Sequence, residues 1–241
     1  MPLYLALMLG SISIPFLLSF DRKVAFYRHW PVLLPSILIT GVFFAALDIY
    51  FAAKGIWGFN PRYHTGIILA HLPLEEWLFF ILIPYASIFI HFVLKAYFPS
   101  TVLNDRTTRT ITFTLILILT AAIITGPGRI YSVTYFSLMA IVLLISLFRK
   151  VRLLNSFYIS FPVILIPFII VNGILTGSLI EGEIVWYNPA EITGIRLITI
   201  PVEDFAYGFS LIFINLLLID YFQRLISNRK NKQNWKSGKP G

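Results

Sequence analysis

Long apolar runs alternate with short polar segments along most of the chain. Seven runs are each about as long as a bilayer-spanning helix, at residues 2–20, 31–52, 74–97, 109–126, 131–148, 157–177 and 203–225. The pattern predicts an all-α integral membrane protein with seven transmembrane helices. The first run lacks the basic start and the small-residue cleavage site of a signal peptide, so we expect it to remain as a spanning helix.

The composition agrees with a membrane class. Of the 241 residues, 58% are hydrophobic and 12% are charged, whereas soluble domains average about 45–50% apolar and about 25% charged residues. The chain has no cysteine, which excludes disulfides, thiolate metal sites and cysteine nucleophiles. The net charge of +8 lies mostly in short loops and the tail, so we expect membrane lipids rather than nucleic acid as the partner.

The basic residues predict the orientation in the membrane. Of the 19 lysines and arginines, all but four fall on one side of the predicted helices, and the exceptions are Lys54, Arg62, Arg129 and Arg196. The positive-inside rule then places the N-terminus outside and the C-terminus in the cytoplasm. We therefore expect a multi-pass protein of the cytoplasmic (inner) membrane whose basic tail, residues 227–241, is cytoplasmic.

The two halves of the chain repeat one another. "YLALM" at 4–8 returns as "YFSLM" at 135–139, a shift of 131, and the stretch 59–77 returns at 187–205, a shift of 128. The repeats predict three helices in residues 1–108, a connector helix in 109–130 and three helices in 131–226. Because the connector restores the direction of the chain, this 3+1+3 arrangement predicts two parallel repeats around a pseudo-two-fold axis along the membrane normal.

The same acidic motif opens the third and the seventh run. Glu75 and Glu76 follow "LPL", and Glu203 and Asp204 follow "IPV". Acids in the first turn of a helix are favoured by the helix dipole, but two copies with the same upstream Asn-Pro and Gly favour a functional role. Adjacent helical residues point about 100° apart, so one acid of each pair can face a shared cavity. Two carboxyls in a low dielectric do not both ionise, so one would hold a proton and the pair could act as acid and base.

Other polar and aromatic residues near the same outer end are candidates to line that cavity. Asp48 and Asn172 fall late in the second and sixth runs, and ionisable residues inside a membrane are functional candidates by default. Six aromatic residues could wall the cavity and stabilise a cation: Trp77, Phe79, Phe80, Phe205, Tyr207 and Phe209. His64 and His71 have no counterparts in the second repeat, so we expect no symmetric metal site.

These motifs carry a resemblance to a known family. The stretches "WGFNP…LPLEEWLFF" and "VNGILTG…VWYNPAEITGI…IPVEDFAYGF" resemble the heterodimer-type lycopene β-cyclase family, with its two small subunits fused in one chain. The resemblance carries the motif Pro-x-Glu-Glu to Glu75 and Glu76, the motif Pro-x-Glu-Asp to Glu203 and Asp204, and two Asn-Pro turns to Asn60 and Asn188. One departure is His91-Phe92, where similar members have an aromatic residue followed by Glu.

The resemblance implies a function. It implies cofactor-free, acid–base cyclisation of the ψ-ends of lycopene to β-ionone rings, giving β-carotene through γ-carotene, with a lipid-soluble carotenoid as substrate and other carotenoid-pathway enzymes as possible partners. All four carboxyls would then be catalytic, and we expect the loss of Glu75 or Glu203 to remove most activity.

Two other readings remain open. Two parallel three-helix repeats also form the SWEET-type sugar transporters, and a carotenoid-binding protein without catalysis would share the apolar interior. The midplane stretches of the third and seventh runs are almost wholly apolar and the acids gather at one end. This distribution favours an enzyme that acts on a lipid-soluble substrate.

Overall fold

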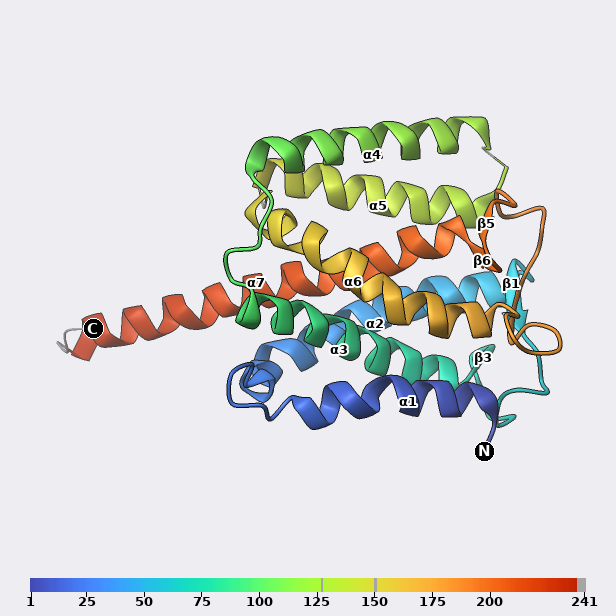
Figure 1. Ribbon diagram of the computed structural model, residues 1–241, viewed down its shortest axis with the longest axis horizontal. Coiled ribbons are helices and arrows are strands. Elements are labelled where there is room, and N and C mark those ends of the chain that lie inside the picture. Colours follow the sequence, from blue (N-terminus) through green and yellow to red (C-terminus); the bar gives the residue numbers. More distant parts are fainter. Residues whose placement is uncertain (127, 150, 238–241) are drawn as a thin grey trace.

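The computed structural model describes residues 1–126, 128–149 and 151–237 as a bundle of helices with small strands at one end (Figure 1). The helices are α1 (Leu3–Leu18), α2 (Trp30–Ala53), α3 (Leu74–Tyr97), α4 (Asp105–Thr125), α5 (Ile130–Arg149), α6 (Val151–Leu175) and α7 (Val202–Ser237). A short 3-10 helix, Phe26–His29, precedes α2. The N-terminus lies at the strand end of the bundle, and the end of α7 projects beyond the opposite end.

Six of these helices are long and apolar enough to cross a membrane, namely α2 to α7. This confirms the all-α membrane class. The first helix, α1, has only 16 residues, which is about 24 Å at 1.5 Å per residue and less than the hydrocarbon thickness of about 30 Å. It is therefore shorter than the sequence pattern predicts.

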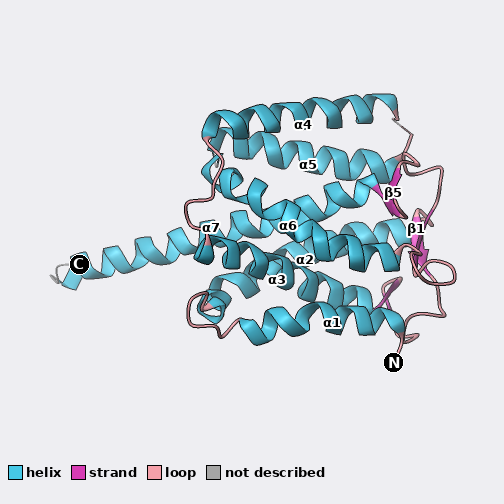
Figure 2. Ribbon diagram, viewed as in Figure 1, coloured by secondary structure: helices cyan, strands magenta, loops and turns pink. Residues whose placement is uncertain are grey.

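Short strands order the loops at the end of the bundle where the acidic motifs lie (Figure 2). β1 (Trp57–Phe59) pairs with β4 (Val185–Tyr187). Two small hairpins precede the acidic helices: β2 (Ile68–Leu69) with β3 (Leu72–Pro73), and β5 (Arg196–Leu197) with β6 (Ile200–Pro201). The hydrophobic pattern predicts no strands here, since strands of two or three residues are too short to show a periodicity.

The pairing of β1 with β4 joins equivalent segments of the two halves. The antiparallel register centres on Gly58 opposite Trp186, two residues that are themselves equivalent at the shift of 128. The indole ring of Trp186 covers Gly58 so closely that a Cβ there would lie 2.6 Å from a ring carbon. The flanking bonds are also equivalent: Asn60 N–H donates to Ile184 O at 2.8 Å and Asn188 N–H to Ile56 O at 2.9 Å.

Each half folds its loop before the acidic helix in the same way. The side chains of Asn60 and Asn188 accept the N–H two residues later, at 3.1 and 3.0 Å. Gly66 and Gly194 both have a left-handed backbone, with φ of +83° and +79°, which glycine adopts without strain. The repeated Asn and Gly of the sequence are therefore loop-forming residues.

Equivalent hydrogen bonds also fix which helical residues correspond. At the start of α1 and α5, Tyr4 N–H donates to Tyr63 O and Ser132 N–H to Glu191 O, a shift of 128 rather than the 131 suggested by the similarity of "YLALM" and "YFSLM". At the ends of α2 and α6, Ile56 N–H donates to Phe51 O and Ile184 N–H to Leu175 O. The two acceptors, Phe51 and Leu175, are 124 residues apart, so the shift between the helices α2 and α6 is 124. At this shift Asp48 is the counterpart of Asn172.

Candidate active site

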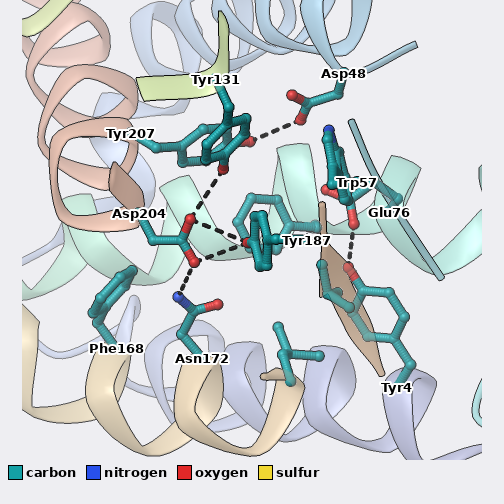
Figure 3. A pocket seen from close by; sticks show the side chains of 13 residues that line it. Tyr4, Asp48, Trp57, Glu76, Tyr131, Phe168, Asn172, Tyr187, Asp204 and Tyr207 are labelled. Carbon is teal, nitrogen blue, oxygen red and sulfur yellow. Dashed lines mark hydrogen bonds between the residues drawn. The ribbon is translucent and has the colours of Figure 1, made fainter. Parts of the chain in front are cut away.

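Three carboxyl groups from both halves line one small cavity near the strand end of the bundle. They are Asp48 of α2, Glu76 of α3 and Asp204 of α7, and the cavity has a volume of about 40 Å³ (Figure 3). All three side chains are buried. Because like charges in a low dielectric repel strongly, three carboxyls in one buried cavity are not all ionised together, and the cluster holds at least one proton.

Asp204 is the carboxyl with the most hydrogen-bond donors. Tyr131 donates to its Oδ1 at 3.0 Å, and Asn172 donates to its Oδ2 at 2.9 Å. The hydroxyl of Tyr187 lies between both oxygens, 3.1 and 2.9 Å away. Donors on both oxygens stabilise the ionised form of a carboxyl group. Asp204 is therefore built to carry a fixed negative charge.

The tyrosine from β4 stays protonated beside this charge. Burial raises the pKa of Tyr187 well above its usual range, and the nearby Asp204 raises it further. Its hydroxyl therefore acts as a donor to Asp204 and not as a base.

The other two carboxyls have fewer donors. Glu76 accepts a hydrogen bond from the hydroxyl of Tyr4. Asp48 accepts from Tyr135 at 2.7 Å and from Tyr207 at 3.3 Å. With a single phenol donor, the negative form of Glu76 is the least stabilised of the three, so Glu76 is the best placed to carry the proton.

The first acid of each pair is turned away from this cluster toward its own loop. Glu75 accepts the backbone N–H of Thr65 at 2.7 Å, and Glu203 accepts the N–H of the equivalent Thr193 at 2.6 Å. Ser132 also donates to Glu203. Both side chains are fully buried. Their hydrogen bonds tie the loops to the helix starts, so the two members of each acidic motif have different surroundings.

A larger apolar groove leads to the acid cluster. It has a volume of about 610 Å³ and lies between α1, α3, α6 and α7. Phe79, Phe168 and Tyr207 line both the groove and the acid cavity, so the two spaces adjoin. At the surface the groove reaches Ile14 and Ile170, which are 66% and 60% exposed. A long apolar molecule can therefore lie in the groove with one end at the carboxyl groups.

The remaining residues predicted to bind substrate divide into two groups. Asn172 lines both spaces, as Phe79 and Tyr207 do. Phe205 packs against Phe168 of this lining, with their ring centroids 5.2 Å apart. The other three contact the loops and the hairpin: Asn60 and Asn188 form loop turns, and the indole N–H of Trp77 on α3 donates to Leu69 O of β2 at 3.2 Å.

Sequence reasoning missed five aromatic residues of the acid cavity: Tyr4, Trp57, Tyr131, Phe168 and Tyr187. Trp57 and Tyr187 stand in the "WGFNP" and "VWYNP" segments, so the Asn-Pro repeat was a signal for them. Tyr4 and Tyr131 begin the first helix of each repeat, far from the acids in sequence. Among the described residues, no group of three or more His, Asp and Glu side chains has the geometry of a metal site.

The fold and the site define an α-helical membrane protein in which an apolar groove ends at three buried carboxyl groups. The model of the lycopene cyclase family matches residues 1–94 and 128–222, well over half of the chain. The chain therefore belongs to the lycopene cyclase family, and the family expected from the sequence motifs is confirmed.

A bifunctional lycopene cyclase/phytoene synthase from Phycomyces blakesleeanus is 43% identical to the chain over 63 residues. The matched stretch covers 26% of this chain and 10% of that relative, so the chain spans a small part of its length. No solved structure matches the chain significantly. Neither finding supports the transporter alternative.

Proposed function

We propose that this protein cyclises the ψ-ends of lycopene to β-ionone rings by acid–base chemistry without a cofactor. The observation that carries the proposal is the contact between an apolar groove and three buried carboxyls, Asp48, Glu76 and Asp204. A hydrocarbon chain has no polar group for such a site to recognise, so the carboxyls are there to react with it or to stabilise charge on it. Family membership supports the same substrate class.

Each ring closure needs one proton transferred to the substrate and one proton removed from it. Glu76 transfers its proton to the terminal C=C bond of the ψ-end, which leaves a tertiary carbocation. The neighbouring double bond attacks this cation, closes the six-membered ring and moves the positive charge into it. The Glu76 carboxylate then removes a proton from the ring carbon beside the charge, which forms the ring double bond. Reactant and product have the same atoms and electrons, so no redox partner takes part.

Asp204 and the aromatic walls stabilise the cation. A preorganised negative charge near a developing positive charge lowers the barrier because no reorganisation is needed during the reaction. Trp57, Phe79 and Tyr207 line the cavity, and the faces of aromatic rings attract cations. The same rings keep water from the cation, which would otherwise be trapped as an alcohol.

We further infer that the chain forms two parallel three-helix repeats, α1–α3 and α5–α7, with α4 as the connector. The symmetric register of β1 and β4 supports a pseudo-two-fold axis between Gly58 and Trp186. The family matches, 1–94 and 128–222, also leave α4 outside both matched regions. The acid cluster lies near this axis, since it takes Asp48 and Glu76 from one repeat and Asp204 from the other.

Expression in a bacterium that accumulates lycopene tests the activity. We expect lycopene to decrease and carotenes with β-rings to appear when the pigments are separated by chromatography. A catalytically silent carotenoid binder would leave the pigment composition unchanged. Unchanged lycopene in cells whose membranes contain the protein would reject the cyclase.

Reporter fusions test the proposed orientation in the cytoplasmic membrane. Fusions after Arg109 and Arg152 should report a cytoplasmic location, and fusions near Arg62 and Arg129 an external one, because lysines and arginines concentrate on the cytoplasmic side. The acid cluster would then lie near the outer face of the membrane. The reverse pattern of reporter activity would show that the protein has the opposite orientation in the membrane.

A further inference from the structure

The pseudo-two-fold relation between the repeats predicts a second groove, between α5, α7, α2 and α3, equivalent to the open one. Its lining residues follow from the equivalent hydrogen bonds described above. At the shift of 128, Gly10 of α1 corresponds to Leu138 of α5, and Gly208 of α7 to Phe80 of α3. The two glycines line the open groove, and their counterparts carry large apolar side chains.

Two further equivalences show the same replacement. Leu7 of the open groove corresponds to Tyr135, and Leu175 corresponds, at the shift of 124, to Phe51. Tyr135 and Phe51 are almost fully buried, and their rings lie 5.8 Å apart. Phe80 is buried as well. In the described part of the chain, these aromatic side chains fill the space that the open groove leaves free on the other side of the axis.

The acids of the two repeats also form one shared cluster. Glu76 and Asp204, the equivalent acids of the two repeats, line the same cavity and do not form two separate sites. Within the described residues, the loops are thus pseudo-symmetric, but the open groove and its reacting groups are not duplicated across the axis. A linear carotenoid has two ends at opposite tips of a long, stiff chain. A groove of about 610 Å³ is in the range that holds one drug-sized molecule, so such a chain has no room to turn round inside it.

We propose that the protein closes one ring per binding event, and that the monocyclic carotene returns to the membrane before its second end reacts. The inference rests on the proposed cyclase function. The exit is the lipid-facing mouth between α1 and α6, where Ile14 and Ile170 are exposed. Each ring closure remains an isomerisation in which one proton is gained and one is lost.

Isotope dilution in vesicles that contain the protein tests this release. Unlabelled lycopene is supplied in excess, and deuterated monocyclic carotene is added shortly after the start. We expect the monocyclic carotene to accumulate first, the bicyclic carotene to follow after a lag, and the label to enter the bicyclic product in proportion to its share of the monocyclic pool. Bicyclic carotene without a lag and without label would overturn the proposal. A complete absence of rings would instead reject the cyclase function.

A substitution in the groove tests whether both ends of the carotenoid react at one site or at two different sites. Gly10→Leu introduces the residue of the filled side into the open groove, where a Cβ has no neighbour within 4 Å, so the helix itself tolerates it. If both ends use this groove, the rates of first and second ring closure should fall by the same factor, of the order of 10–200-fold for an occupied apolar pocket. Leu9→Phe, at an exposed neighbour outside the groove, should change neither rate. A Gly10→Leu variant that still closes one ring at the normal rate, but not the other, would require a second site.

Discussion

Glu76→Gln should reduce ring formation by about 10²–10⁴-fold, the usual loss when a general acid is removed. The glutamine side chain has nearly the same volume and still accepts the hydrogen bond from Tyr4, but its amide has no acidic proton to transfer to a C=C bond. The measurement is pigment conversion per unit of membrane-inserted protein. The alternative outcome, near-normal conversion, would remove Glu76 from the chemistry.

The matched control is Glu75→Gln, at the adjacent residue. Glu75 accepts the N–H of Thr65, a bond that an amide oxygen also accepts. We expect a cost of about 1–3 kcal/mol in stability from the imperfectly paired amide group, seen as less inserted protein, and near-normal conversion by each inserted molecule. The geometry thus moves the expected catalytic loss from the first acid of each pair to the second. Equal losses in both variants would contradict this division.

Asp204→Asn should lower conversion by about 10²–10³-fold, the scale measured when a preorganised electrostatic group is removed. The substitution removes the negative charge that faces the carbocation but keeps the shape of the side chain. It also leaves Tyr131, Tyr187 and Asn172 aimed at a neutral amide, so some loss of stability accompanies the catalytic loss. Pigment conversion is again expressed per unit of membrane-inserted protein.

The control for this variant is Glu203→Gln, which lies one residue earlier and bonds the loop of Thr193. Its conversion per molecule should stay near that of the unmodified protein. A second check uses the products: without the fixed charge, a longer-lived cation is exposed to water, so Asp204→Asn should yield a larger share of hydroxylated carotene. A variant with full conversion and unchanged products would show that Asp204 is only a structural ligand of its three donors.

The sequence by itself determined the membrane class, the positions of the helices and the internal repeat. These features are encoded locally, because a bilayer-spanning helix needs a long apolar run and a repeat is visible by comparison of one half with the other. It also identified the acidic motifs, and its expectation that the two members of a pair face different directions follows from helix geometry alone. The contact between Asp220 and Arg224 at 3.1 Å follows from the same periodicity.

Only the tertiary structure decided which acid of each pair meets the cavity. Glu75 and Glu76 are the same residue type, so the sequence does not distinguish them. In the structure, the loop that carries Thr65 lies on the side toward which Glu75 points. Tyr4 and Tyr131 join the cluster through helices that are remote in sequence from the acids, and no periodicity encodes such contacts. Side-chain volumes at positions such as Gly10 and Tyr135 likewise decide that one pseudo-symmetric groove is open and the other is filled. The residues that these side chains contact are set by packing across the bundle and not by the local sequence pattern.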